Sequence, residues 1–245
     1  MTAEPEANGT VKAARARRYD TGTVRFSQRD IDGLLLLGEH YGAPQDLLAE
    51  WLGVGHLRAN AIMARWRRTG YVETGQLGSG PPWNWLTRDG MQATGLGFPA
   101  TPPTLGRIAH HRAILAARIW LTSTPAWADG HAWWHSERRI LAERPLRRGG
   151  HHPDAEIHWP DIDGSPYAGQ IWAIEVELSA KQLERTAQIM TGMLTSTRYA
   201  TLVYLTSPGA RSAVRHAVAS LAAEDQARVA VRDLPANAFR PKLPR

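Results

Sequence analysis

The segment that most constrains the fold of this 245-residue chain is the alternating run at residues 171–178. Side chains of a β-strand point alternately to opposite faces of the sheet. The apolar residues at the even-numbered positions would therefore share one face, and Glu175 and Glu177 would share the other. The pattern predicts a strand that carries two carboxylates beside an apolar core.

Two such carboxylates, about 6 to 7 Å apart, repel each other by roughly 2 to 3 kcal/mol at an effective dielectric constant of about 20. A divalent cation relieves that repulsion, and Mg²⁺ or Mn²⁺ takes oxygen ligands from one or two carboxylates. Asp154, which follows Pro153, would complete the site from a neighbouring strand. The other interpretation is an ordinary solvated strand face. The Pro-Asp pair, the spacing and Lys181 favour the metal site.

The composition narrows the class of protein. The absence of cysteine excludes disulfides and cysteine-ligated zinc. The sequence has no apolar stretch long enough to span a bilayer and no apolar segment near its start, so we expect a cytoplasmic protein without a membrane partner. The formal net charge of +6 favours a polyanionic partner. Almost all of the basic residues are arginines, which suit phosphates and guanine edges, although a GC-rich genome gives the same bias.

Breaks in composition divide the chain into five segments. The first is small, polar and basic, typical of a disordered arm that touches a phosphate backbone or of an ordinary solvated tail. The predicted segments are a disordered basic arm at 1–20, a winged helix-turn-helix domain at 21–97, a linker at 98–106, a second folded domain at 107–235 and a tail at 236–245.

The winged helix-turn-helix prediction rests on the order of elements in the first domain. Ser27 is placed to cap a helix with an apolar stripe that includes Ile31. The predicted elements are helices at 27–40, 45–52 and 56–68, then strands at 71–72 and 83–87 around a tip rich in Gly, Ser and Pro. Helix, short helix, turn, helix and a two-stranded wing is the order of this DNA-binding fold.

The third helix is the predicted DNA-reading element. Its predicted inward face consists of Leu57, Ala61 and Ala64. Its predicted DNA contacts are Arg58, Arg65, Arg67 and Arg68. Such a helix enters a major groove or lies along phosphates of double-stranded DNA, and a homodimer would read paired half-sites. Winged domains that bind only protein are the alternative.

The second domain alternates helices and strands. The predicted elements are a helix at 107–121, strands at 132–140, 153–158 and 171–178, a helix at 180–196, a strand at 200–206, a helix at 210–223 and a strand at 228–232. This order predicts an α+β or α/β domain with a central mixed sheet flanked by helices.

That order, together with Pro153, Asp154, Glu175 and Glu177, resembles the PD-(D/E)XK nuclease superfamily over residues 105–234. With the preceding winged domain and the phrases Trp-His-Ser-Glu-Arg at 134–138 and Glu-Val-Glu-Leu at 175–178, the chain resembles the replication-relaxation family of mobile-element proteins, which is related to MobC-type conjugative relaxases. The resemblance implies action at an origin-like DNA site during plasmid or integrative-element replication or transfer in bacteria.

The resemblance also implies roles for individual residues. Asp154 and Glu175 would hold Mg²⁺ or Mn²⁺, with the carbonyl of Val176 as a third ligand. Glu177 occupies the usual lysine position, and Lys181 follows at the start of the next helix. Glu177 or Lys181 would orient the attacking water, and Lys181 would stabilise the charged transition state. The same departure from the motif is also what an inactive nuclease would show.

Other polar residues are placed near this site. Arg185 and Gln188 would share one helix face with Lys181 and line a DNA channel, unless that face is simply solvated. Glu137 would be a further acidic member of the site, or else a salt-bridge partner of Arg138 or Arg139. A basic rim for phosphate approach would comprise Arg138, Arg139, Arg144, Arg147 and Arg148.

The paired histidines are assigned to less specific places. His151 and His152 invite a zinc interpretation, but the number of ligands is too small, so we expect a polar loop near the site. His110 and His111 are expected at a helix surface or core edge. The leading function is a metal-dependent DNA endonuclease or nickase. The alternatives are a catalytically inactive DNA-binding regulator of replication or transfer and a protein-interaction scaffold.

Overall fold

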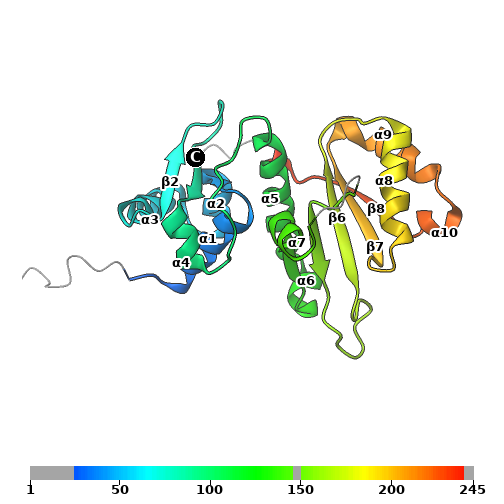
Figure 1. Ribbon diagram of the computed structural model, residues 1–245, viewed down its shortest axis with the longest axis horizontal. Helices are drawn as coiled ribbons and strands as arrows, with labels where there is room; N and C mark the ends of the chain where they lie inside the picture. Colours follow the sequence, from blue (N-terminus) through cyan, green and yellow to red (C-terminus); the bar gives the residue numbers. More distant parts are fainter. Residues whose placement is uncertain (1–24, 146–149, 240–245) are drawn as a thin grey trace, which may run out of the picture.

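The computed structural model describes residues 25–145 and 150–239. It is a mixed α+β structure with a three-stranded antiparallel sheet and a five-stranded mixed sheet, each flanked by helices (Figure 1). The predicted basic arm at 1–20 and two members of the predicted basic rim, Arg147 and Arg148, lie outside the described residues.

The first half of the chain forms the smaller sheet and the helices around it. Its elements are α1 (Gln28–Glu39), β1 (Ala43–Pro44), α2 (Gln45–Trp51), α3 (His56–Arg68), β2 (Val72–Gly75), β3 (Trp83–Leu86) and α4 (Arg88–Thr94), with sheet order β1-β3-β2. Ser27 caps α1 as predicted, in a capping box with Asp30. Helix α4, which Thr87 caps, was not predicted.

The predicted inward faces of α1 and α3 are partly wrong. Ile31 is 43% exposed and Leu57 is 83% exposed. The buried residues of α3 are instead Ala59, Ile62, Met63 and Trp66. Trp66 sets this rotation, because a Cβ at Gly33 of α1 would meet its ring at 2.5 Å, so the indole packs directly on the α1 backbone. Burying this one large aromatic outweighs burying Leu57 and the two alanines at the positions predicted to face inward.

The second half contains the larger sheet. Its elements are α5 (Ile108–Thr122), α6 (Pro125–Gly130), β4 (Trp133–Ser136), α7 (Glu137–Glu143), β5 (Ala155–His158), β6 (Ile171–Glu177), α8 (Leu183–Thr195), β7 (Thr201–Thr206), α9 (Pro208–Ala219), α10 (Ala223–Gln226), β8 (Val229–Asp233) and the 3-10 helix η1 (Ala236–Ala238). The sheet order is β4-β5-β6-β7-β8, antiparallel as far as β6 and parallel beyond it.

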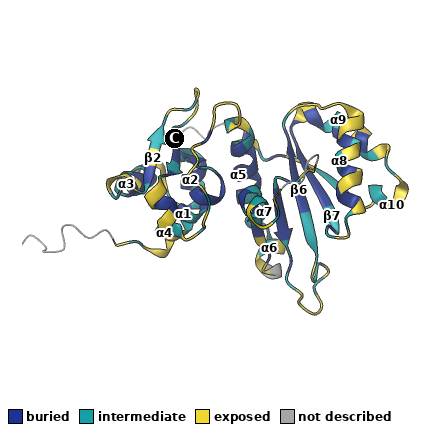
Figure 2. Ribbon diagram, in the orientation of Figure 1, coloured by how far each residue is buried: buried dark blue, intermediate teal, exposed yellow. Residues whose placement is uncertain are grey.

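Helices cover both faces of this sheet. Helix α5 lies on one face, between the sheet and the first half of the chain, and α8 and α9 lie on the other (Figure 1). The central strands are largely buried, as Figure 2 shows. The segment predicted as one strand at 132–140 is β4 followed directly by α7, because Ser136 caps that helix through the amide of Arg139.

The two halves share one continuous apolar core and several buried polar contacts. Arg112 of α5 donates to both carboxylate oxygens of Asp46 of α2, at 2.9 and 2.6 Å. Arg118 donates to Glu39 at 2.6 Å. Within the predicted tail at 236–245, η1 packs on α5, where Arg112 donates to the carbonyl of Asn237, and residues 240–245 lie outside the described residues.

Within the described ranges, none of the helices combines the length and the apolar character needed to cross a bilayer.

Candidate functional site

Asp154 lies at the start of β5 and reaches across to β6. Its Oδ2 accepts a hydrogen bond from the main-chain amide of Val176 at 2.8 Å. Its Oδ1 lies 2.8 Å from Nε2 of His110 of α5. Burial lowers the pKa of His110, but the hydrogen bond to Asp154 and the Asp154 charge outweigh it and leave the pKa raised. The carboxylate of Asp154 thus joins strand β6 to helix α5.

Glu175 is buried in β6, next to the residue that binds Asp154. Its Oε1 lies 2.8 Å from Nε2 of His151. Burial raises the pKa of Glu175 to about 7, the hydrogen bond from His151 opposes that rise, and the charge of Asp154 adds to it. The pKa of His151 is raised, chiefly by its hydrogen bond to Glu175. The negative charge of Asp154 is therefore close enough to disfavour that of Glu175.

Glu177 ends strand β6 and pairs with Lys181. The Lys181 Nζ lies 2.7 Å from the Glu177 carboxylate. Lys181 was expected at the start of a helix, but α8 begins only at Leu183, so the lysine lies in the preceding loop. Tyr204 of the adjacent strand has a raised pKa, first from burial and then from the charges of the three acids Glu175, Glu177 and Asp154. All three carboxylates therefore act on one region at the end of the sheet.

Glu137 approaches the same region from the first turn of α7. It pairs with Arg107 at 3.2 Å, not with Arg138 or Arg139 as the salt-bridge interpretation had it. Its charge also raises the pKa of His110, after the effects of burial, Asp154 and Arg107. Glu137 is thus a neighbour of the Asp154 end of the site.

The donor chemistry at this site fits a hard divalent cation. Asp154 and Glu175 provide carboxylate oxygens, and the carbonyl of Val176 faces the same edge of β6 as its amide, which binds Asp154. Mg²⁺ needs only one or two carboxylates, because it keeps several waters. Among the described residues, Asp154 and Glu175 do not belong to a group of three ligand side chains whose ligand atoms all lie within 4.8 Å of one another. The expected ligand set of two carboxylates and the Val176 carbonyl stays a prediction.

A tighter cluster of potential ligands lies on β4 and β5. In the part of the chain that the structure describes, His135, Glu156 and His158 place ligand atoms within 4.8 Å of one another. Glu156 is fully buried and contacts Arg144, which donates to Oε1, and Arg198, which donates to both oxygens at 3.1 and 2.8 Å. Two guanidiniums on one carboxylate repel a further cation, so this cluster is better described as a polar network.

The same network fixes the pKa of Glu156. Burial alone would raise the pKa, but hydrogen bonds from His158, Arg198 and Tyr199 hold it well below its ordinary value. The Tyr199 hydroxyl donates to Oε1 at 2.7 Å. Glu156 is therefore an anchor for the arginines around it.

A basic pocket of about 500 Å³ lies between this network and helix α8. Its lining includes two residues predicted for the DNA channel, Arg185 and Gln188, both exposed. The other lining residues are Arg144, Gly150, His151, His152, Ile189, Gly192, Met193, Ser196, Arg198 and Tyr199. Because His151 also contacts Glu175, the pocket adjoins the acidic site.

The predicted DNA-contacting arginines fall into two groups. Arg58, Arg67 and Arg68 are exposed on α3. Arg65 is only partly exposed and forms an ion pair with the buried carboxylate of Asp30, so its guanidinium is already used inside the domain. Arg65 is therefore not available for DNA in the way that the other three predicted contacts on α3 are.

Two members of the predicted basic rim, Arg138 and Arg139, contact other residues of the protein. Arg138 is 6% exposed and donates to the carbonyls of Gly38, at 2.7 Å, and Pro99. Its guanidinium also lies over the rings of Tyr41 and Phe98. It was expected at the surface but is buried between the two halves. Arg139 pairs with Glu39 at 3.2 Å and stays partly exposed.

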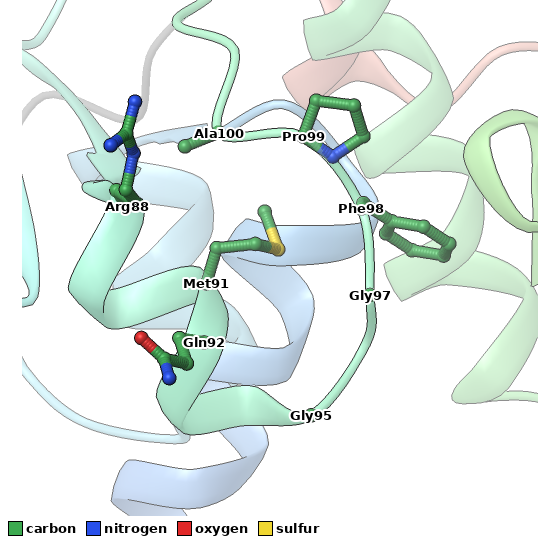
Figure 3. Close-up of a pocket in the computed structure, with 8 residues that line it drawn as sticks. All are labelled: Arg88, Met91, Gln92, Gly95, Gly97, Phe98, Pro99 and Ala100. Atoms are coloured by element: carbon green, nitrogen blue, oxygen red, sulfur yellow. The ribbon is translucent and has the colours of Figure 1, made fainter.

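A separate cavity of about 550 Å³ lies between α4 and the chain that follows it. Figure 3 shows Met91 projecting into this space and Phe98 turned away from it. Its lining residues are Arg88, Met91, Gln92, Gly95, Gly97, Phe98, Pro99 and Ala100. The lining has one charged side chain and neither carboxylate nor histidine, so it lacks the groups for acid–base or metal chemistry.

Sequence reasoning did not identify the histidine partners of the two carboxylates. His110 was assigned to a helix surface or core edge, and His151 to a polar loop. His110 is 44 residues away from Asp154 in the sequence, so no local pattern joins them. The available signal for His151 was its position just before the Pro-Asp pair.

Comparisons with known proteins leave the chain without an established family. No family model matches it, and no curated protein matches it. A solved structure described as PigF with SAH is similar at 12% identity with a TM-score of 0.19. The alignment covers 84% of this chain and 62% of that one.

Proposed function

We propose that this protein is a metal-dependent DNA endonuclease or nickase with a PD-(D/E)XK-like catalytic half and a winged helix-turn-helix half that selects the site. The observation that carries the proposal is the placement of Asp154, Glu175 and the Glu177–Lys181 ion pair at one end of β5 and β6. A relaxase-like role in the replication or transfer of a mobile element remains part of the proposal through the resemblance of its sequence motifs.

The proposed chemistry is hydrolysis of a phosphodiester by water. Asp154 and Glu175, with the Val176 carbonyl, would hold Mg²⁺ or Mn²⁺, and the bound cation would supply charge stabilisation and a more acidic water. Glu177 would accept the proton of the attacking water, whose oxygen bonds to phosphorus as the bond to the leaving oxygen breaks. Lys181 would donate a hydrogen bond to the charge that develops on the phosphate. The leaving oxygen takes up a proton, so the products are one phosphate end and one hydroxyl end.

The DNA-binding half of the proposal rests on the first sheet and its helices. The element order α1-β1-α2-α3-β2-β3 with sheet order β1-β3-β2 supports a winged domain. Helix α3 presents Arg58, Arg67 and Arg68 to solvent, and the β2–β3 hairpin would be the wing. These side chains suit contacts to the phosphates of double-stranded DNA.

The test is nicking of supercoiled plasmid by the full chain in Mg²⁺ or Mn²⁺. We expect nicking that EDTA abolishes and that Asp154→Asn and Glu175→Gln each reduce by at least about a hundredfold. Asp163→Asn and Glu224→Gln are matched controls, because both residues are exposed and lie outside the site. Nicking that survives both site substitutions would contradict the enzyme proposal.

The alternative is a DNA-binding regulator with an inactive nuclease fold. The observation in its favour is that both carboxylates already have histidine partners, His110 on Asp154 and His151 on Glu175. In that case the protein would retain DNA in a salt-dependent manner and show no nicking with either metal.

A further inference from the structure

The basic pocket beside the candidate site has an excess of positive charge. Its lining contains three arginines, Arg144, Arg185 and Arg198, and no carboxylate among the described residues. Two of them, Arg144 and Arg198, share the single carboxylate of Glu156 beneath the pocket. One negative charge cannot neutralise two guanidiniums, so one positive charge remains, and Arg185 adds a second.

Two of these cations, Arg144 and Arg198, are held in place by Glu156. Arg198 donates to Glu156 through Nε and an Nη atom, which fixes the plane of its guanidinium. A guanidinium fixed in this way loses little side-chain freedom when it binds an oxyanion through its remaining N–H groups. The pocket is concave, with Ile189 and Met193 contributing apolar surface. Its shape and charge fit a phosphate group with an attached nucleoside.

We propose that this pocket binds a phosphate group of the DNA strand engaged at Asp154 and Glu175. The inference rests on the proposed DNA-processing function and assigns that site a strand-holding subsite. His151 connects the two, because it lines the pocket while its Nε2 lies 2.8 Å from Glu175. A phosphate within the strand and a terminal phosphate share the chemistry that the pocket recognises.

Gly192 offers a test that leaves the arginines in place. It is exposed on α8, lines the pocket, and a Cβ at this position would meet no atom within 4 Å. Gly192→Glu therefore introduces a negative charge into the pocket, and Gly192→Gln introduces a side chain of the same size without the charge. Arg185→Gln, with Arg185→Lys as its control, tests the same pocket from a second position. Thermal unfolding of each variant checks that the fold is kept.

The measurement is fluorescence anisotropy of an oligonucleotide labelled at its 3′ end, with EDTA present and at several salt concentrations. Two otherwise identical strands carry either a 5′-phosphate or a 5′-hydroxyl. We expect Gly192→Glu to bind roughly tenfold more weakly than Gly192→Gln at low salt, because a carboxylate in the pocket repels a phosphate. For Gly192→Glu, the slope of log affinity against log salt concentration should be less steep than for Gly192→Gln, by about one released counterion.

The two strands identify the source of the phosphate. If the pocket binds a terminal phosphate, the difference between the Glu and Gln variants appears with the 5′-phosphate and vanishes with the 5′-hydroxyl. If it binds a phosphate within the strand, both oligonucleotides show the difference. Equal affinities of the two variants for both strands, or no binding by the unmodified protein, would overturn the proposal.

The outcome is separable from that of the hydrolysis proposal, because binding is measured without metal. Absence of nicking by the unmodified protein, together with a clear difference in DNA binding between Gly192→Glu and Gly192→Gln, would retain the phosphate pocket and reject the enzyme. Nicking that depends on Asp154, with equal DNA binding by Gly192→Glu and Gly192→Gln, would support the enzyme and reject the phosphate pocket.

Discussion

Nε2 of His151 lies 2.8 Å from Oε1 of Glu175, so a half-exposed imidazole covers a carboxylate that is otherwise buried. The pKa of Glu175 is raised to about 7, first by burial, and that of His151 is raised by the hydrogen bond between them. Burial thus favours the protonated form of Glu175, and the hydrogen bond favours the protonated form of His151. A cation at this site would compete with those protons, because metal ligation needs the carboxylate form.

The stability contributed by Glu175 should fall as the pH rises. Its folded-state pKa lies above its ordinary value of 4.5, so the folded protein keeps a proton that the unfolded chain releases. His151, also with a raised pKa, acts in the same direction. We therefore compare the free energy of unfolding of Glu175→Gln with that of the unmodified protein. The difference, variant minus unmodified, should increase by roughly 2 kcal/mol between about pH 5 and about pH 8. Urea unfolding at the two pH values measures it, and a constant difference would contradict it.

Glu156 should show the opposite dependence on pH. Its folded-state pKa is depressed, so its contribution to stability is present above the ordinary value of 4.5 and is lost on acidification. Glu156→Gln leaves Arg144 and Arg198 without their shared charge and should cost about 3 kcal/mol at neutral pH. Urea unfolding at decreasing pH should show this deficit shrinking below about pH 4. The exposed Glu224→Gln variant is the control, and a deficit that does not depend on pH would argue against the network.

Arg138 should contribute to stability far more than its neighbour in the sequence. Arg138→Gln removes hydrogen bonds to the carbonyls of Gly38 and Pro99 and contacts with two aromatic rings, and should cost about 2 to 4 kcal/mol. Arg139→Gln removes one partly exposed ion pair and should cost less than about 1 kcal/mol. Chemical denaturation of both variants makes the comparison. Similar small losses would mean that Arg138 does not join the two halves.

Substitutions at Arg58 and Arg65 should affect different properties, DNA binding for Arg58 and stability for Arg65. Arg58→Gln should weaken DNA binding about equally across sequences and lower the salt slope by about one, with an unchanged unfolding midpoint. Arg65→Gln should lower stability by about 1 to 2 kcal/mol, because buried Asp30 loses a charged partner. DNA titrations and unfolding curves of the two variants measure both effects. A fall in stability for Arg58→Gln equal to that for Arg65→Gln would remove the distinction.

Lys181 should affect nicking without affecting the fold. Its side chain is nearly half exposed but pairs with the buried carboxylate of Glu177, so Lys181→Gln should cost about 1 to 2 kcal/mol of stability while the protein stays folded. If Lys181 stabilises the transition state, the nicking rate in Mn²⁺ should drop by about a hundredfold. Plasmid nicking time courses, with Lys181→Arg as the charge-conserving control, measure the drop. An unchanged rate would exclude Lys181 from the proposed chemistry.

The elements with strong local signals were predictable from the sequence. The alternation at 171–178 appears as β6, and the helix at 56–68 has the predicted bounds. The Ser27 cap also forms as predicted, because capping joins residues three apart. Helices α4, α6 and α7 are short, and each lacks a complete apolar stripe, which is the signal that periodicity detects.

The sequence by itself determined the strand that carries Glu175 and Glu177, the position of Asp154 just before its neighbour, and the basic character of the chain, because alternation, spacing and composition are local properties. Only the tertiary structure decided that His110 and His151 are partners of the two carboxylates, that Arg138 and Arg65 are held inside, and that Glu156 anchors the pocket arginines. These contacts join residues far apart in the chain, and their energies depend on burial, which no local pattern records.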